Sequence, residues 1–244
     1  MKVEYLFIVE SRNDEAFIRI ILKDLLVKNA EIFVLDNFGF ETLHHIEATE
    51  FRGKKALDER LERLKGQLQF GNYQYIKHLS IILDADSPKD GGGLPESIKL
   101  VNQAFGKGLK LYPEFTAEGQ FRTLSLNLSG ENFEFSASCF FLKTENGEGH
   151  LDTVLKAIAC KSAPESECLE ALWLPCVEGK TGKGLSNFEK LWINFYVRAH
   201  ATSKQKGAME EKFPEVIEKM GAEIFNLNHP VLNDLKAYLK SFSN

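Results

Sequence analysis

The stretch Ser80-Ile81-Ile82-Leu83-Asp84-Ala85-Asp86-Ser87 is a short apolar run that ends in two aspartates. Such a run is typical of a buried strand that delivers charged side chains at its carboxyl end. Because residues two apart in a strand project to the same side, we expect the carboxylates of Asp84 and Asp86 to face one point. The glycines at positions 91–93 then predict a flexible exit from the strand.

Strand and helix patterns alternate through the first half of the chain. Continuous apolar runs indicate strands buried on both faces, and apolar residues spaced by three and four indicate amphipathic helices. The expected strands are residues 3–9, 32–36 and 79–83, and the expected helices are 14–28, capped by Asn13, and a second one within 41–68. This alternation predicts a parallel sheet covered by helices.

The second half of the chain changes pattern twice. Residues 122–128 and 133–142 alternate with period two and predict two strands, joined by a turn, at or beside an edge of the sheet. Later segments are helical, near residues 151–160, 165–174, 187–201 and 230–242. We therefore expect an α/β domain at residues 1–162, with a mostly parallel sheet flanked by helices, and a helical C-terminal subdomain at 163–244 packed on it.

Composition favours a cytoplasmic protein without membrane contact. No apolar run approaches the roughly 20 residues needed to span a bilayer, and charge interrupts the start Met1-Lys2-Val3-Glu4, unlike a signal peptide. The net charge of -5 gives no global attraction to nucleic acid, so such a contact needs a local basic patch.

The cysteines support the same compartment. Cys139, Cys160, Cys168 and Cys176 form no Cys-x-x-Cys pair and are expected to stay reduced. The even spacing of the last three is compatible with zinc, but we expect buried thiols in helices.

Acidic residues follow two of the expected strands. Ligands of open parallel sheets bind outside the carboxyl ends of the strands, where Glu10 follows the first strand and Asp84 and Asp86 follow the third. If the two strands are neighbours, three carboxylates meet at one edge. Two unit charges 4 Å apart repel by ~4 kcal/mol at an effective dielectric of 20, so such a cluster calls for a cation or a protonated carboxyl. Oxygen ligands alone suit Mg²⁺ or Mn²⁺ better than zinc.

The stretches VESRNDEAFI, residues 9–18, and ILDADS, residues 82–87, resemble the Toprim domain of topoisomerases, primases and overcoming-lysogenization-defect (OLD) nucleases. In that family a glutamate after the first strand and an Asp-x-Asp after a later strand hold Mg²⁺ for phosphodiester chemistry. Glu10, Asp84 and Asp86 stand at these positions. The resemblance implies a Toprim-like, Rossmann-like sheet.

The likeness covers residues 3–160 in order and spacing. Asp14 matches an acidic position of the OLD-type branch, whereas Ser11 replaces a common glycine and puts the turn geometry in question. The chain is also similar to a small set of stand-alone Toprim-like proteins, whose Gly-x-Leu-Glu helix start is echoed at residues 149–155, with Asp152 in place of glutamate.

This resemblance assigns roles to the acidic residues. Asp84 and Asp86 are expected to be the primary Mg²⁺ ligands, and Glu10 a ligand or a general acid or base. Asp14, Asp152 and Glu148 are candidates for a second metal ion. The alternative for Asp14 and Asp152 is that they stabilise helix N-termini.

An anionic substrate also requires basic groups. Two sets are candidates for phosphate contacts: Arg52, Lys54 and Lys55, and, in the tail, Lys180, Lys183, Arg198, Lys204 and Lys206. We expect Lys204, Lys206 and Arg198 to bind substrate, because the OLD-type branch uses a lysine from its late segment.

The sequence thus predicts a Mg²⁺-dependent nuclease, with DNA favoured over RNA as its partner, and compatible with a homodimer or a protein partner. The competing hypothesis is a non-catalytic Toprim-like module that binds metal or nucleotide and regulates a defence or repair system. A third, a receiver-like phosphate acceptor at Asp84, leaves Glu10 unexplained.

Overall fold

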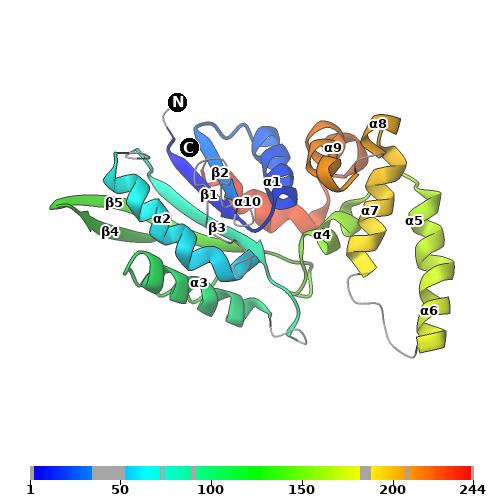
Figure 1. Cartoon of the computed structure of the whole chain (residues 1–244), viewed down its shortest axis with the longest axis horizontal. Coiled ribbons are helices and arrows are strands. Elements are labelled where there is room, and N and C mark those ends of the chain that lie inside the picture. Colours follow the sequence, from blue (N-terminus) through cyan, green and yellow to red (C-terminus); the bar gives the residue numbers. More distant parts are fainter. Residues whose placement is uncertain are drawn as a thin grey trace, which may run out of the picture.

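The computed structural model describes residues 3–34, 53–71, 73, 75–88, 92–181, 188–206 and 209–242. Its centre is a five-stranded sheet with the strand order β2-β1-β3-β5-β4 (Figure 1). The strands are β1 (Tyr5–Val9), β2 (Ala30–Val34), β3 (His78–Asp84), β4 (Arg122–Leu128) and β5 (Glu131–Leu142). All neighbouring strands are parallel except β4 and β5, which pair antiparallel at the edge. The expected α/β fold with a mostly parallel sheet is therefore confirmed.

Helices cover both faces of this sheet (Figure 1). In chain order they are α1 (Arg12–Asp24), η1 (Gly53–Ala56), α2 (Leu57–Gln69), α3 (Leu94–Gly108), α4 (Leu151–Ile158), α5 (Pro164–Cys168), the π-helical η3 (Leu169–Trp173), α6 (Leu174–Thr181), α7 (Phe188–His200), α8 (Ser203–Lys206), α9 (Met209–Ile224), η4 (Pro230–Leu232) and α10 (Asn233–Lys240). Helices α2 and α3 pack on one face, and α1, α4, α7, α9 and α10 share a core with the other.

Alternation along the strands separates these two cores. Phe7 of β1 and Ile82 of β3 belong to the core with α1 and α4, whereas Ile8 and Ile81 belong to the core with α2 and α3. The side chain of Asp84 follows Ile82 by two residues, so the strand directs it toward α1 and α4.

Several element ends differ from the sequence expectation. Ser11, not Asn13, caps α1, because its hydroxyl accepts the backbone N–H groups of Asn13 and Asp14. The first helix therefore starts before residue 14, and β2 lies two residues earlier than expected. Residues 41–52 of the second expected helix lie outside the described residues. Helix α9 was not expected at all, and it contains Pro214.

The last helix returns to the middle of the sheet. The hydroxyl of Tyr238 lies 2.5 Å from Ser80 Oγ and 2.6 Å from Ser138 Oγ, on the adjacent strands β3 and β5. All three side chains are buried. Helices α7, α9 and α10 thus share the core under the sheet.

Among the described residues there is no helix long and apolar enough to cross a bilayer.

Candidate metal centre

Strands β1 and β3 are adjacent and in register, with Val9 paired to Ile82. Glu10 follows β1 and Asp84 ends β3, so both stand at the carboxyl edge of the sheet. The pKa of Asp84 is raised well above its ordinary value, first by burial and then by the negative charges of Asp14 and Glu10. Glu10 and Asp14 are therefore each close enough to Asp84 to repel its charge. Of the three carboxylates expected at this edge, Glu10 and Asp84 meet, and Asp14 joins them from α1.

Asp14 belongs to the same group and also caps α1. Its Oδ2 accepts the backbone N–H of Ser11 at 2.8 Å and the Ser11 hydroxyl at 2.6 Å, which completes a capping box. Burial, with a smaller contribution from the negative charge of Asp152, raises the pKa of Asp14 to about 6 against these hydrogen bonds. The interpretation of Asp14 as a helix-stabilising residue is thus confirmed, and the helix cap places its carboxyl beside Asp84.

The first turn of α4 faces this group. The backbone N–H of Leu151 donates to Asp84 Oδ1 at 2.9 Å, which satisfies one of the free N–H groups of the helix start. Asp152 is in the same turn, and burial raises its pKa, while His150 and Lys190 lower it. The His150 ring lies 3.7 Å from the Asp152 carboxylate.

Asp86 departs from the predicted geometry. Strand β3 ends at Asp84, and Asp86 has a φ of 59°, in the left-handed region. A two-way backbone bridge to Gly149 holds it there, through hydrogen bonds of 2.8 and 3.3 Å. Asp86 therefore lines a pocket with residues of α3, including Ser97 and Leu100, whereas Asp84 meets α1 and α4. The expectation that both carboxylates face one point is wrong, because the turn rotates the second one away.

The turn after Asp86 is close-packed. A Cβ on Gly92 would lie 2.5 Å from Asp86 Cβ, so only glycine fits there. The N–H of Gly92 donates to Ser87 O at 3.0 Å, and that of Gly93 donates to Ala85 O at 2.8 Å. At Gly92 and Gly93 the exit from β3 is thus hydrogen-bonded where a flexible segment was expected, and residues 89–91 lie outside the described residues.

Lys54 bridges the two aspartates from the element before α2. Its ammonium group donates to the Asp86 carboxylate and to the backbone carbonyl of Asp84. Its positive charge lowers the pKa of Asp84. Lys54 was predicted only as one of a basic set, and no local pattern links it to residues 84–86. The other members of that set, Arg52 and the Lys55 side chain, lie outside the described residues.

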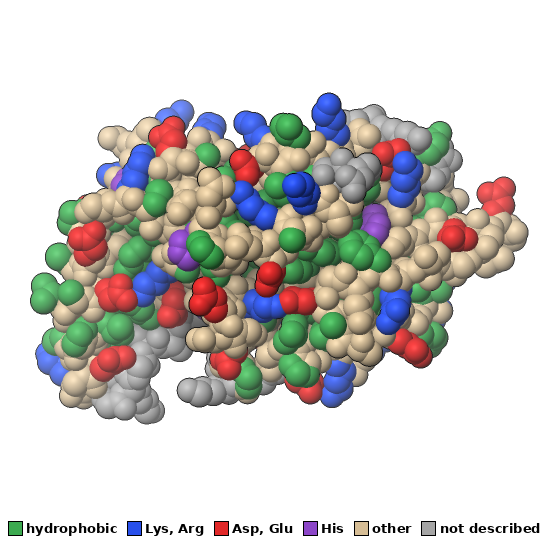
Figure 2. All heavy atoms as spheres, turned by 180° about the vertical axis from the view of Figure 1, so that it is seen from behind, with side chains coloured by type: hydrophobic (Ala, Val, Ile, Leu, Met, Phe, Trp, Pro, Cys, Tyr) green, Lys and Arg blue, Asp and Glu red, His purple; other side chains and the backbone are tan. Residues whose placement is uncertain are grey.

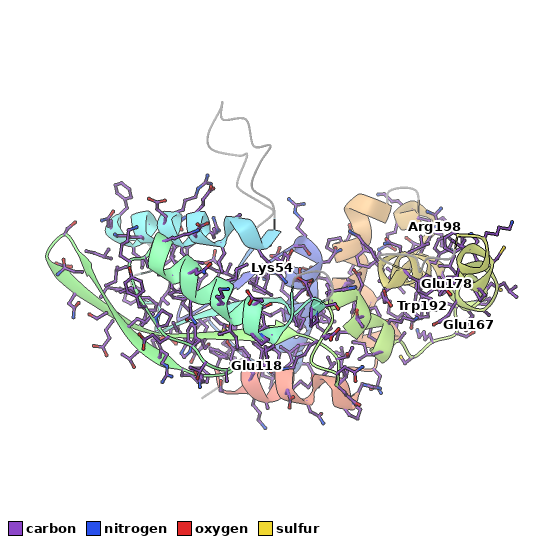
Figure 3. All side chains as sticks on the ribbon, turned by 90° about the horizontal axis from the view of Figure 1, so that it is seen from below. Lys54, Glu118, Glu167, Glu178, Trp192 and Arg198 are labelled. Carbon is purple, nitrogen blue, oxygen red and sulfur yellow. The ribbon has the colours of Figure 1, made fainter. Side chains whose placement is uncertain are left out.

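The basic residues of the tail lie elsewhere. Arg198 is in the last turn of α7, about 12 Å along the helix from Lys190, which acts on Asp152. Lys204 and Lys206 are in α8, beyond that end of α7. Figure 3 shows Lys54 in the middle of the molecule and Arg198 at its helical end. The structure thus brings Lys54 and Lys190, instead of Arg198, Lys204 and Lys206, to the carboxylates.

The remaining basic and acidic candidates are peripheral. Lys180 is exposed in α6, and Lys183 lies outside the described residues. The exposed Glu148 accepts a hydrogen bond of 3.0 Å from the Ser87 hydroxyl. On the face shown in Figure 2, Lys and Arg side chains are scattered among acidic and apolar ones. That face offers no continuous basic track.

The cysteines correct one expectation. Cys139 is buried in β5, but the three later cysteines, Cys160, Cys168 and Cys176, are exposed and all four are free. The thiols expected to be buried in helices are thus at the surface: Cys168 and Cys176 lie in α5 and α6, which expose most of their side chains, and Cys160 follows the end of α4.

The donor chemistry of this centre fits Mg²⁺ or Mn²⁺, since Glu10, Asp14, Asp84 and Asp152 offer oxygens whose mutual repulsion a cation would relieve. In the described part of the chain, however, no three acidic, histidine or cysteine side chains are placed to share one ion. The hydrogen bonds from Ser11 to Asp14 and from Leu151 to Asp84, and the ion pair of Lys54 with Asp86, occupy the carboxylates instead. Binding a cation therefore requires some of these side chains to rotate.

A family model described as "Protein of unknown function (DUF3226)" matches residues 4–244. No curated protein and no solved structure matches the chain.

Proposed function

Because the chain belongs to the DUF3226 family, whose function is unknown, its activity has to be inferred from its own residues, and we propose that it hydrolyses phosphodiester bonds of nucleic acid with a divalent cation. The observation that carries this proposal is the raised pKa of Asp84, which the neighbouring Asp14 and Glu10 carboxylates help to cause. Strongly shifted carboxyls at the ligand-binding edge of a parallel sheet are typical of functional sites.

The cation would be held by Glu10 and Asp84, with Asp14 and Asp152 as further oxygen donors. Bound Mg²⁺ or Mn²⁺ polarises a phosphoryl oxygen and offsets the charge that develops on it. The Leu151 N–H orients the carboxyl of Asp84 through Oδ1. Burial raises the pKa of Asp14 to about 6 in the metal-free protein, and a bound cation would favour its ionised form.

Lys54 and Lys190 are the lysines that act on these carboxylates, and both are suited to attract a phosphate group. We propose DNA as the substrate and the cytoplasm as the compartment, where the exposed thiols would stay reduced.

A second function has support of its own. The carboxylates are not arranged as a ready-made ligand set within the described residues, and the face in Figure 2 lacks a basic track. Both observations weigh against cation-dependent cleavage and favour a non-catalytic module that regulates a partner.

Nicking of supercoiled plasmid separates the two functions. We expect the wild type to nick DNA with Mg²⁺ or Mn²⁺ but not with EDTA, and Asp84→Asn and Glu10→Gln to lose about 100-fold or more of this activity. Glu134→Gln, at an exposed position of β5, is the matched control and should keep it. A wild type that Mn²⁺ stabilises against heat but that nicks no faster than Asp84→Asn is a binding module. A wild type with neither response rules out the nuclease and a metal-binding module.

A further inference from the structure

The outer edge of strand β4 has no pairing partner in the described part of the chain. β4 is the last strand in the sheet order, and there its backbone groups hydrogen-bond only to β5. Figure 1 shows the hairpin of β4 and β5 at the end of the molecule opposite α5 and α6. A row of N–H and C=O groups along β4 is therefore available to another strand.

This edge lacks the features that usually prevent such pairing, which are short length, lysine, proline or a bulge. β4 is seven residues long, and its sequence RTLSLNL contains neither lysine nor proline. Its register with β5 is continuous, and its one charged residue, Arg122, stands at the first position. The edge is thus open along its whole length.

The side chains of β4 alternate in character. Leu126 and Leu128 are buried in the core with α2 and α3, and Leu124 packs against the same core. The residues between them, which point to the other face, are exposed and uncharged: Thr123, Ser125 and Asn127.

This alternation makes β4 complementary to a second copy of itself. In an antiparallel pair centred on Ser125, Leu124 faces Leu126 of the partner subunit, and Thr123 faces Asn127 of the partner subunit. Because facing residues share one side of a sheet, apolar side chains meet apolar ones and polar side chains meet polar ones.

The charges favour the same register. In this pair the partner's Arg122 faces Leu128, which in turn faces Glu131 of β5. Neighbouring strands lie about 4.8 Å apart, so the long arginine side chain and Glu131 approach each other across Leu128 on one face. The two-fold axis repeats this attraction at the other end. No like charges face each other, because Arg122 is the only charged residue of β4.

We propose that β4 is a dimerisation edge, at which two copies of the chain pair antiparallel about Ser125 and join their five-stranded sheets into one. The edge-to-edge contact is small, so we expect a weak dimer with a Kd of about 1–100 µM. This inference is independent of the chemistry proposed for the acidic residues, and nicking of plasmid does not test it.

Sedimentation equilibrium over a series of protein concentrations tests the dimer. Ser125→Glu places two carboxylates face to face on the two-fold axis, beside Glu134 of the neighbouring strand. We expect it to weaken the dimer by about 100-fold or more. Ala222→Glu is the matched control, because it adds the same charge at an exposed position of α9, and it should stay within about twofold of the wild type.

Mixing two variants keeps the test valid if the substitution disturbs folding. The Ser125→Glu chain should dimerise again when Ser125→Lys is added, because opposite charges then face each other, and should not do so when more Ser125→Glu is added. Circular dichroism and the melting midpoint report whether each variant is folded.

A cysteine at the same position tests the register. Facing Cα atoms in an antiparallel pair are about 4.5–5.5 Å apart, within the range of a disulfide. Ser125→Cys should therefore link two chains under oxidised glutathione. Asn127→Cys is the control, because its two copies lie about 14 Å apart along the strands, and it should not link them. Both are made in a background that carries serine at the three exposed cysteines, Cys160, Cys168 and Cys176.

Three results overturn the inference. One is a wild type that stays monomeric at every concentration. Another is a dimer that Ser125→Glu weakens no more than Ala222→Glu does, which assigns the contact to another surface, such as the helical end where Leu172 and Trp173 are exposed. The third is equal cross-linking of Ser125→Cys and Asn127→Cys, which shows chance collision instead of a fixed register.

Discussion

The backbone N–H of Leu151 donates a hydrogen bond of 2.9 Å to Asp84 Oδ1, so the start of α4 meets the end of β3. The two residues are separated by 67 positions, and the bridge between Asp86 and Gly149 runs alongside. The helix start supplies a partial positive charge to a carboxyl that its acidic neighbours destabilise. Asp84 thus both ties β3 to α4 and belongs to the candidate metal centre.

Asp84→Asn should make the metal-free protein more stable while it abolishes activity. Asparagine keeps the Oδ1 acceptor for Leu151 but removes the charge that burial and Asp14 oppose. Each unit of raised pKa costs about 1.4 kcal/mol at neutral pH, so we expect a gain of about 1 kcal/mol or more in the free energy of unfolding. Urea unfolding in EDTA measures it. A less stable variant would contradict this electrostatic account.

Added Mn²⁺ should reverse the order of these two proteins. A cation that binds only the folded wild type raises its stability by mass action, whereas Asp84→Asn lacks a ligand and should not respond. The melting midpoint, followed over a series of Mn²⁺ concentrations with Glu134→Gln as control, gives the comparison.

Ser11→Ala should destabilise the protein by about 1 kcal/mol, the usual cost of losing an N-cap hydroxyl. Ser11→Gly, the residue common in Toprim domains, should cost less, because glycine is a tolerable cap. The φ of Ser11 is -132°, an extended conformation that needs no glycine. Urea unfolding of both variants checks the order, and equal losses would argue against a capping role.

The strands could be predicted from the sequence because apolar periodicity reports burial directly, whereas their order in the sheet could not. The runs at residues 3–9 and 79–83 became β1 and β3, and the period-two segments became the hairpin of β4 and β5. The meeting of Glu10 with Asp84 followed from the same reasoning, since carboxyl ends of adjacent parallel strands share an edge.

Other features have no local signature. Aspartate is tolerated in both extended and left-handed backbone. The sequence around Asp86 is therefore as compatible with a continued strand as with the turn that the structure has. Lys54 approaches from 32 residues away, through the packing of α2. Ser11 and Asn13 are both favourable N-cap residues, so the sequence does not distinguish them. The extended backbone angles of Ser11 identify it as the N-cap.

Acid should destabilise the wild type partly through His78. Burial lowers the pKa of His78 from 6.5 to about 4, so the unfolded chain binds this proton more readily than the folded one. The stability that depends on neutral His78 is complete above pH 6.5 and is lost as the pH falls toward 4. Since the ring is partly exposed, we discount the full shift and expect a loss of about 2 kcal/mol.

His78→Phe should remove this part of the pH dependence and keep the ring contacts with Phe121 and Phe242. Urea unfolding of wild type and variant at pH 7 and pH 4.5 isolates the effect, because the carboxylates titrate in both proteins. Parallel stability losses in the two proteins would show that His78 is already exposed to protonation when folded.

Tyr238→Phe should lower the free energy of unfolding by about 2 kcal/mol, because it leaves the buried hydroxyls of Ser80 and Ser138 without this hydrogen-bond partner. The triple variant Ser80→Ala/Ser138→Ala/Tyr238→Phe should recover much of that loss, since no unsatisfied polar group remains. Urea unfolding of both variants decides, and a triple variant no more stable than the single one would contradict the interpretation.

The contacts of Tyr238 also determine when, during translation, this part of the core can form. The tyrosine follows Ser138 by 100 residues and Ser80 by 158, so a ribosome that adds about 5–20 residues per second completes this cluster about 5–20 s after it makes β5. Until then, α10 does not cover the apolar side chains of β1 and β3 on that face of the sheet. During this interval a nascent chain exposes an apolar surface of the kind that chaperones bind. The helix that covers this surface is synthesised last.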